Sequence, residues 1–316
     1  MFKEMFKKIG KIIALGLVLS SCLFANIGAV PHVIFGTWQT GDKTQELVVS
    51  AIKTGIRHID TAQSYGNEHM VGAAIRQCIQ EGIIRREDIQ VTTKIMPEEV
   101  MKRYSSPAKY TYDAISELIN ESLTRLGLEY IDTVLIHEED HVNGYEIWRS
   151  LAEYRNKNPH KIRKIGLSNY IYNWLCEQTI RIAKPDVIQN PFFPGSRKVF
   201  DNTCIYYNWK KHDNIEFEGY KPIGHGLLVD NVYVKELAKK YNVNPASICL
   251  KYCLLNGVSP VFSSTNPSHI FDNIKGLNSL NVYSEDSDSD DTSIDEIDRL
   301  DRCLLEIMVE KVLYAD

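Results

Sequence analysis

Apolar and polar positions alternate in blocks along the chain. Short runs of β-branched and apolar residues end in polar residues, and longer stretches with apolar residues at helical spacing follow them. The pattern predicts eight strands, at HVIFGT (32–37), IRHID (56–60), IQVTTK (89–94), IDTVLIH (131–137), RKIGLSN (163–169), DVIQN (186–190), NIEFEGY (214–220) and SPVFSS (259–264).

A helical pattern follows each of these strands. It is clearest in QELVVSAIKTG, HMVGAAIRQCIQEG and YDAISELINESLTRLG, and the last two end at Gly82 and Gly127, as helices commonly do. Eight strand–helix units predict an α/β fold of the (β/α)8 TIM-barrel class over residues 26–283, because eight parallel strands covered by helices close without an edge. A doubly wound open sheet is the alternative, weakened because no GxGxxG motif opens the first unit.

The first 25 residues have the profile of a signal peptide. The basic stretch MFKEMFKKIGK precedes the apolar run IIALGLVLS, which is too short for a convincing membrane span. Leu19, Ser20, Ser21 and Cys22 resemble a lipoprotein signal in which Cys22 would carry a lipid anchor, and cleavage after Ala25 is the competing possibility. We expect an exported or envelope-anchored protein, while an N-terminal extension on a cytoplasmic protein stays open.

Two segments near the C-terminus lie outside the alternation. The acidic, Ser-rich run at 284–298 predicts a solvated loop. Residues 299–316 are expected to form a C-terminal helix that packs on the barrel. The run lacks the Gly and the final Glu of a calcium-binding EF-hand loop, so we assign no chemistry to it.

Composition excludes several classes of function. The chain of 316 residues is 44% hydrophobic and carries 36 basic against 41 acidic side chains, so it is globular and has no basic field for nucleic acid. Its seven cysteines form no CxxC pair and no Cys/His set at zinc spacing, so neither a disulfide framework nor a metal site is predicted.

Four titratable residues follow the ends of three predicted strands. Asp60 ends the second strand with Tyr65 five residues later, Lys94 ends the third, and His137 ends the fourth. In a TIM barrel the carboxyl ends of the strands surround the active site. Together these groups can form a proton donor for a carbonyl. The phenol has an ordinary pKa of about 10, and a Lys ammonium lowers that pKa. A carboxylate holds the Lys in place, and an imidazole orients the substrate oxygen.

Hydrolysis is a weaker interpretation of the same strand ends. No GxSxG elbow, and no Cys with an adjacent base, lies in such a position. A TIM-barrel hydrolase with paired carboxylates would need two acidic residues at facing strand ends, and Asp60 alone is convincingly placed.

The motifs around these residues resemble the aldo-keto reductase family over residues 27–280. GIRHIDTAQSYGNE (55–68) is similar to the family motif around its Asp and Tyr, VTTKI (91–95) to its Lys strand, and RLGLEYIDTVLIH (125–137) to the approach to its His. FGTWQ, IGLSN, VIQNPF and GYKPIGHGLL follow in the family's order. The resemblance implies a catalytic tetrad with Tyr65 as general acid and His137 positioning the carbonyl, and hydride transfer from a nicotinamide cofactor to a small aldehyde or ketone without a metal.

The resemblance also implies a set of cofactor-binding residues. Ser168, Asn169 and Gln189 match positions that bind the nicotinamide carboxamide, and Tyr220 matches the aromatic residue that stacks on the nicotinamide ring. Gly36, Thr37 and Trp38 match the first loop, where Trp38 is also a candidate wall of the substrate pocket. The segment for the adenosine 2′-phosphate and the adenine matches Ser263, Ser264, Thr265, His269 and Asn273.

That last segment departs from the family's pattern. NADP-binding members usually place Lys where Ser263 stands and Arg where His269 stands, and those cations pair with the 2′-phosphate. Lys221 replaces the usual Ser after the stacking Tyr, near the expected pyrophosphate, and could compensate. The family resemblance favours NADPH as the cofactor, and NADH is the alternative.

The physiological substrate and the oligomeric state are not readable from the sequence. The loop HEEDHVNGYEIW after His137 is acidic and would repel anionic substrates if it lined the pocket. An exported enzyme would meet little reduced nicotinamide, so the alternative is a catalytically inactive nucleotide-binding or regulatory protein of aldo-keto reductase shape. The intact tetrad argues against that alternative.

Overall fold

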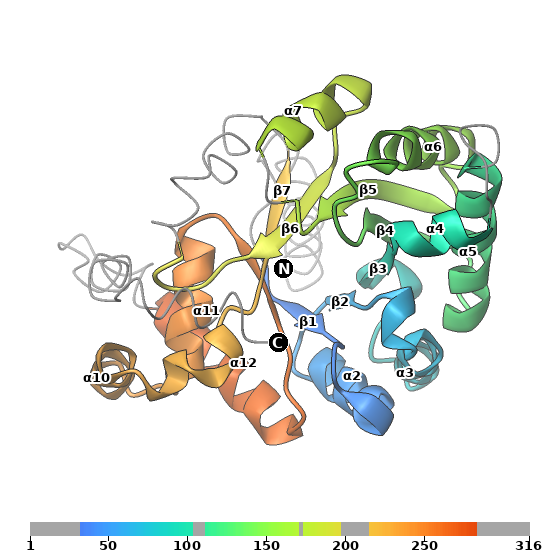
Figure 1. Cartoon of the computed structure of the whole chain (residues 1–316). Helices are drawn as coiled ribbons and strands as arrows, with labels where there is room; N and C mark the ends of the chain where they lie inside the picture. Colours follow the sequence, from blue (N-terminus) through green and yellow to red (C-terminus); the bar gives the residue numbers. More distant parts are fainter. Residues whose placement is uncertain (1–31, 104–110, 171–172, 197–214, 283–316) are drawn as a thin grey trace, which may run out of the picture. The chain divides into compact units, whose positions relative to one another are not determined.

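Eight parallel strands form a closed barrel in the order β1 to β8. Figure 1 labels the strands from β1 to β7 near the centre of the molecule, with helices around them. The computed structural model describes residues 32–103, 111–170, 173–196 and 215–282. The strands are β1 (Ile34–Gly36), β2 (His58–Asp60), β3 (Gln90–Ile95), β4 (Ile131–Ile136), β5 (Ile162–Ser168), β6 (Val187–Pro191), β7 (Glu216–Tyr220) and β8 (Ser259–Phe262). Each lies at a run predicted from the sequence, so the (β/α)8 prediction is confirmed.

The barrel closes between its first and last strands. Phe35 of β1 pairs with Ile59 of β2 on one side and with Phe262 of β8 on the other. The Phe35 and Phe262 rings meet edge to face at 5.7 Å between centroids, and both side chains are buried. This closure leaves no strand edge exposed, which is why such short strands form a stable sheet.

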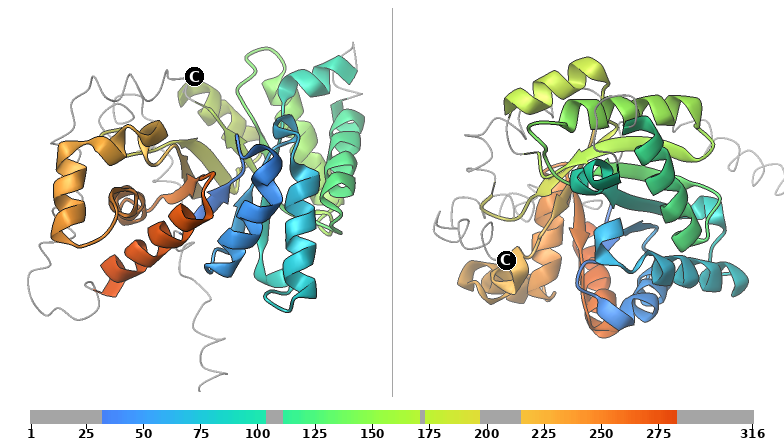
Figure 2. Two further views of the ribbon diagram at one scale, coloured as in Figure 1. Left: turned by 90° about the horizontal axis from the view of Figure 1, so that it is seen from below. Right: turned by 45° about the vertical axis from the view of Figure 1, so that its right-hand side comes forward.

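Helices follow the strands along the chain, and Figure 2 shows several of them side by side on the outside of the barrel. The pairs α2 with α3, α3 with α5, and α12 with α2 are in contact. The helices are α2 (Thr44–Lys53), α3 (Glu68–Gln80), α4 (Pro97–Arg103), α5 (Thr111–Leu126), α6 (Gly144–Lys157), α7 (Asn173–Ile182), α10 (Val232–Lys240), α11 (Pro245–Leu255) and α12 (Pro267–Val282).

Helix α5 shows why these segments are helical and where they pack. Ala114, Leu118, Ser122 and Leu126, spaced four residues apart, are all buried and form one face. Gly127 ends the helix in the left-handed conformation, at φ 62°. The predicted C-terminal glycine is therefore confirmed, as is Gly82 after α3 at φ 71°.

Helices α3 and α5 approach each other closely at one glycine. A β-carbon at Gly72 would lie 1.7 Å from the carbonyl oxygen of Leu126 at the end of α5. Arg76, one turn further along α3, donates to the same oxygen at 2.5 Å. Only the absence of a side chain at residue 72 permits this contact between backbones.

Several predictions fall outside the described residues. These are the signal peptide at 1–25 with the lipid anchor at Cys22, the acidic loop at 284–298, the C-terminal helix at 299–316, and the helix expected between β6 and β7. Within the described ranges, no helix is both long and apolar enough to cross a membrane.

Candidate active site

The carboxyl ends of the strands surround a cavity of about 770 Å³. Its lining comes from both ends of the sequence, because β1 and β8 are neighbours. The residues that line it are Gly36, Trp38, Gln39, Thr40, Asp60, Tyr65, His137, Glu138, Ser168, Asn169, Gln189, Tyr220, Lys221, Pro222, Ile223, His225, Gly226, Val261, Phe262, Ser263, Ser264 and Thr265.

A buried ion pair lies at the floor of this cavity. Lys94 is 1% exposed, and its Nζ donates to Asp60 Oδ1 at 2.5 Å and to the Thr61 carbonyl oxygen at 3.1 Å. Strands β2 and β3 place the two side chains together, because Asp60 pairs with Thr92, two residues before Lys94. Burial lowers the pKa of Lys94, but the Asp60 carboxylate and the Tyr65 phenol raise it by more, so the side chain stays an ammonium.

Tyr65 lies within reach of this ammonium. It ends the 3₁₀ turn η2 (Gln63–Tyr65), which Gly66 terminates at φ 70°, and its hydroxyl lies 3.4 Å from Lys94 Nζ. Burial raises the pKa of Tyr65, while the Lys94 ammonium acts in the opposite direction. The phenol is therefore protonated at neutral pH, with a cation beside it that would stabilise the tyrosinate.

His137 completes the predicted tetrad. It follows β4, and its ring meets the Tyr65 ring edge to face at 5.6 Å between centroids. Burial, followed by the Lys94 ammonium, lowers the pKa of His137 to about 3, so the imidazole is neutral. Ser64 Oγ lies 3.3 Å from its Nδ1, and among the described residues Nε2 has no partner. A hydroxyl that donates to Nδ1 leaves the proton on Nε2, where it can be donated to a ligand.

The predicted carboxamide-binding residues lie beside the tetrad. Asn169 donates to the His137 carbonyl oxygen at 2.7 Å and accepts a hydrogen bond from the Tyr220 hydroxyl. Gln189 Nε2 donates to Asp60 Oδ2 at 2.8 Å. Ser168 and Gln189 are almost fully buried but line the cavity. The structure thus brings all of these residues to the same opening.

The other predicted cofactor residues divide into two groups. Gly36, Trp38, Lys221, Ser263, Ser264 and Thr265 line the cavity. Thr37 does not, because it is fully buried and its hydroxyl donates to the Asp60 carbonyl oxygen at 3.1 Å. His269 is exposed and Asn273 is buried, both on α12 and outside the lining. Their assignments to the cofactor stay predictions.

Unusual backbone conformations gather around the cavity. In the described part of the chain, five residues other than glycine have a positive φ near 55°, and Gln39, Asn169, Lys221 and His225 are four of them. All four line the cavity, whereas the fifth, Asn242, does not. Residues held in this left-handed region cost about 1 kcal/mol or more each and cluster at functional sites.

Three residues of this region were missed by the sequence analysis. Asn67 is buried beneath the first loop, where its amide donates to the Thr37 carbonyl oxygen at 2.8 Å. His225 meets the Trp38 ring at 6.1 Å across the cavity mouth. Glu218 and Asp60 both accept from the Gln189 amide nitrogen. The alternation of NIEFEGY places Glu218 on the same strand face as Tyr220 and could have revealed it.

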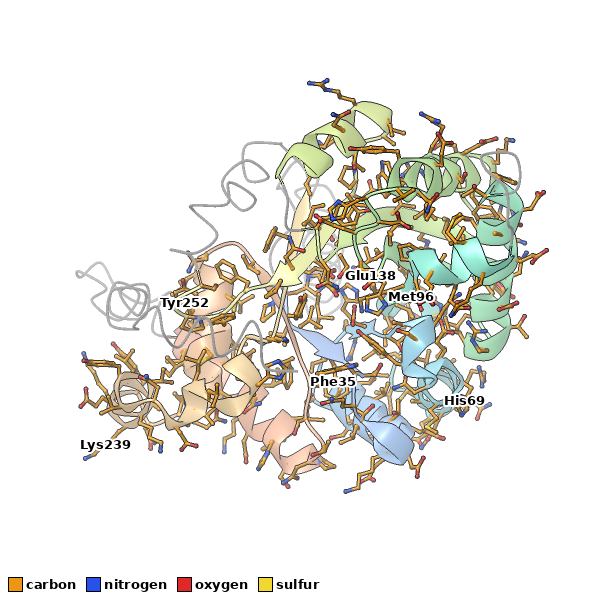
Figure 3. The ribbon with its side chains drawn as sticks, viewed as in Figure 1. Phe35, His69, Met96, Glu138, Lys239 and Tyr252 are labelled. Atoms are coloured by element: carbon orange, nitrogen blue, oxygen red, sulfur yellow. The ribbon has the colours of Figure 1, made fainter. Side chains whose placement is uncertain are left out.

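An acidic residue also borders the cavity. Glu138, labelled in Figure 3, follows His137 directly and is exposed in the lining. The acidic loop after His137 therefore contributes one carboxylate to the opening, which disfavours an anionic group placed beside that carboxylate.

Comparison with known proteins identifies the relatives of this fold and site. The model of the Aldo/keto reductase family matches residues 32–298. The chain belongs to the aldo/keto reductase family. It is accordingly an oxidoreductase. An uncharacterized oxidoreductase of Schizosaccharomyces pombe is 32% identical to this reductase over 77% of this chain and 83% of its own length.

Two further relatives carry more specific names. Glyoxal reductase of Bacillus subtilis is 32% identical over 74% of this reductase and 78% of its own length. Among solved structures, a Bombyx mori aldo-keto reductase in complex with NADP is 25% identical, has a TM-score of 0.66, and covers 85% of this chain and 88% of its own.

Proposed function

We propose that the chain reduces a small aldehyde or ketone with a reduced nicotinamide cofactor, and that Tyr65 is the general acid. The observation that carries the proposal is the chain of contacts from Asp60 through Lys94 to the Tyr65 hydroxyl, at the floor of a cavity that His137 also lines. General carbonyl reduction follows from membership of the family, and the residue roles are our proposal.

Tyr65 gives its proton to the substrate oxygen. As negative charge develops on the phenol, the Lys94 ammonium at 3.4 Å stabilises it, and Asp60 holds that ammonium in place. Because the cation is fixed before the reaction begins, no reorganisation is needed when the charge moves.

His137 orients the carbonyl. Its neutral imidazole donates from Nε2 to the substrate oxygen, with Ser64 holding the opposite ring nitrogen. A neutral donor suits this role, because an imidazolium would compete with Tyr65 as the proton source.

The donor set of the cavity fits a carboxamide. Both N–H groups of the Gln189 amide are used by the carboxyl groups of Asp60 and Glu218, so its Oε1 is the atom that can accept from the carboxamide N–H₂, while the Ser168 hydroxyl can donate to the carboxamide oxygen. The Tyr220 ring lies beside them as a stacking surface. When bound, the reduced nicotinamide supplies the hydride that reaches the carbonyl carbon.

The substrate that this cavity favours is uncharged. Glu138 and the partly apolar ring of Trp38 border the opening, so an anionic aldehyde would be repelled. The name of the Bacillus subtilis relative, glyoxal reductase, supports small dicarbonyl compounds as the first substrates to test. The direct test follows cofactor oxidation with a panel of neutral and acidic aldehydes, and no turnover of any neutral aldehyde would refute the proposal.

We expect NADPH to be preferred over NADH by less than about a hundredfold. Ser263, Ser264 and Thr265 supply hydroxyls to the 2′-phosphate site, but none carries a fixed charge, and the Ser264 hydroxyl already bonds to Asn266. Charge-assisted hydrogen bonds are about twice as strong as neutral ones. Titration of tryptophan fluorescence with each cofactor measures the ratio, and a preference near a thousandfold, about 4 kcal/mol, would contradict this account of the site.

The same site allows a gain of function. Ser263→Lys adds a cation at the 2′-phosphate and should raise the affinity for NADPH about tenfold while leaving that for NADH unchanged. Ser279→Lys adds the same charge near the far end of α12 and serves as the control.

A further inference from the structure

A second carboxyl group lies near the Asp60–Lys94 pair, on the other side of the Gln189 amide. Residues 216, 218 and 220 of β7 share one face of the strand, and Tyr220 on that face lines the cavity. Glu218 therefore points into the barrel, where it is 1% exposed. A buried carboxyl group at this depth requires partners that offset its loss of hydration.

Glu218 and Asp60 share the amide group of Gln189. Gln189 Nε2 donates to Asp60 Oδ2 at 2.8 Å and to Glu218 Oε2 at 2.8 Å. One amide nitrogen has two N–H groups, so the two carboxyl groups together use its full donor capacity. This arrangement fixes the orientation of the Gln189 amide and directs its oxygen away from both carboxyl groups.

The second oxygen of Glu218 is not satisfied by a hydrogen bond. Within the described residues Oε1 has no hydrogen-bond partner, and His58 Nδ1 lies 4.0 Å from it. Burial, followed by the charges of neighbouring groups, lowers the pKa of His58, so this ring is neutral. Its Nε2 and Nδ1 contact Thr92 at 2.7 Å and His32 at 2.8 Å.

Two lysines of the barrel strands, the buried Lys94 of β3 and the partly exposed Lys164 of β5, are already paired with other carboxylates. Lys94 binds Asp60 at 2.5 Å, and Lys164 binds Glu216 at 2.5 Å. Ionisation of two carboxyl groups that share a site costs free energy through charge repulsion, so the carboxyl group without a cation stays protonated. Glu218 is the member of this group without a cation among the described ion pairs.

The acid form of Glu218 is accordingly the stable one at neutral pH. Burial raises the pKa of Glu218 to about 8, and the negative charges of Asp60 and Glu216 act in the same direction, whereas Gln189 and Lys94 oppose the change. The side chain is thus neutral at pH 7 and acquires its charge in mildly alkaline solution.

We propose that Glu218 is a positioning residue of the reductase: its neutral acid form fixes the Gln189 amide and keeps a second negative charge away from the Asp60–Lys94–Tyr65 chain. This inference rests on the proposed function. Loss of the Glu218 proton places a negative charge beside the ion pair, which disfavours the developing tyrosinate and slows carbonyl reduction.

Tyr65, Lys94 and His137 do not titrate in the same range. The pKa of Tyr65 and that of Lys94 lie above their ordinary values, and that of His137 lies near 3. A loss of activity centred near pH 8 therefore points to Glu218 among these groups.

The test compares the pH profile of wild type with that of Glu218→Gln. Gln is always neutral and can still accept from Gln189, so the variant mimics the acid form. We expect kcat/KM for a neutral aldehyde to fall about tenfold between about pH 7 and about pH 9.5 in wild type, and by less than about twofold in the variant. Equal profiles, or a wild-type profile with no alkaline fall, would overturn the proposal.

Glu216→Gln is the matched control. It removes the same charge from the same strand face two residues away, without contact to Gln189, and is expected to keep the alkaline fall at a somewhat lower pH, because a negative neighbour of Glu218 is gone. If Glu216→Gln also lost the alkaline decrease in kcat/KM, the decrease would be caused by the net charge of the strand. That result would contradict a specific role for Glu218.

Two further readouts separate a positioning role from a merely structural one. The infrared difference spectrum between about pH 6 and about pH 10 should show the C=O band of a protonated carboxylic acid in wild type and not in Glu218→Gln. Glu218→Leu leaves a Gln189 N–H unpaired and should weaken NADPH binding about fivefold, with Gln restoring it. Absence of the infrared band, or tight NADPH binding by Glu218→Leu, would count against the proposal.

Failure of the proposed function is distinguishable from failure of this inference. Wild type that reduces no neutral aldehyde removes the reductase mechanism, whereas active wild type with a pH profile identical to that of Glu218→Gln removes only the role of Glu218.

Discussion

Tyr65→Phe is expected to lower kcat for aldehyde reduction by about 10²- to 10⁴-fold, the usual contribution of a positioned general acid. The substitution removes one oxygen atom and leaves the ring in contact with the His137 ring. Because, among the described residues, no hydrogen bond joins Tyr65 to Gln189 or Ser168, the affinity for NADPH should stay within about twofold of wild type. Initial rates of cofactor oxidation and a fluorescence titration measure the two quantities.

A matched control separates the effect of removing the Tyr65 hydroxyl from the effect of removing any tyrosine hydroxyl. Tyr233→Phe removes the same atom from a side chain on α10 that is 45% exposed, and it should leave kcat unchanged. Retention of more than about a tenth of the wild-type rate by Tyr65→Phe would reject Tyr65 as the proton donor.

Gly72→Ala is expected to lower the free energy of unfolding by about 3 kcal/mol, at the upper end of the usual cost of overpacking. The added methyl group would meet the carbonyl oxygen, the carbonyl carbon and the Cα of Leu126, all of them backbone atoms that no side-chain rotation can move away. Helices α3 and α5 would have to separate, and the Arg76 hydrogen bond at the same oxygen would be disturbed. Urea unfolding followed by circular dichroism measures the change.

Gly144→Ala is the control for this substitution. Gly144 begins α6, and a β-carbon there would make ordinary contacts of 3.7 Å and 3.8 Å with Tyr170 and Asp140. Replacement of a glycine by alanine, where the backbone conformation and the neighbours permit a β-carbon without strain, stabilises a protein by about 0.4–1 kcal/mol. If the two variants were equally stable, the close approach of α3 to α5 would not be a constraint on the fold.

Much of the fold was predictable because each element carries a local pattern. The short apolar runs mark the eight strands, and the spacing of Ala114, Leu118 and Leu126 marks α5 without knowledge of its neighbours. The four residues of the tetrad were predictable for a related reason, since strand ends of a parallel barrel all open to one face.

The remaining features depend on partners that the sequence does not specify. The alternation of β7 places Glu218 inside the barrel. The contact of Glu218 with the Gln189 amide, which Asp60 also uses, depends on the register between β6 and β7. Asn67 likewise depends on the path of the first loop, which brings the Thr37 carbonyl oxygen to its amide. The low pKa of His137 depends on burial. The sequence does not specify this burial, because a residue at the end of a strand can also be exposed.

The pairing of Phe35 with Phe262 has a consequence for synthesis in the cell. The two residues belong to the first and the last strand of the sheet, so the nascent chain cannot complete the ring until β8 has left the ribosome. Until then β1 and β7 would present open backbone edges that can pair with other chains. Premature termination before Ser259 should therefore give aggregating fragments, and chaperones that shield such edges during translation would have their greatest effect in this interval.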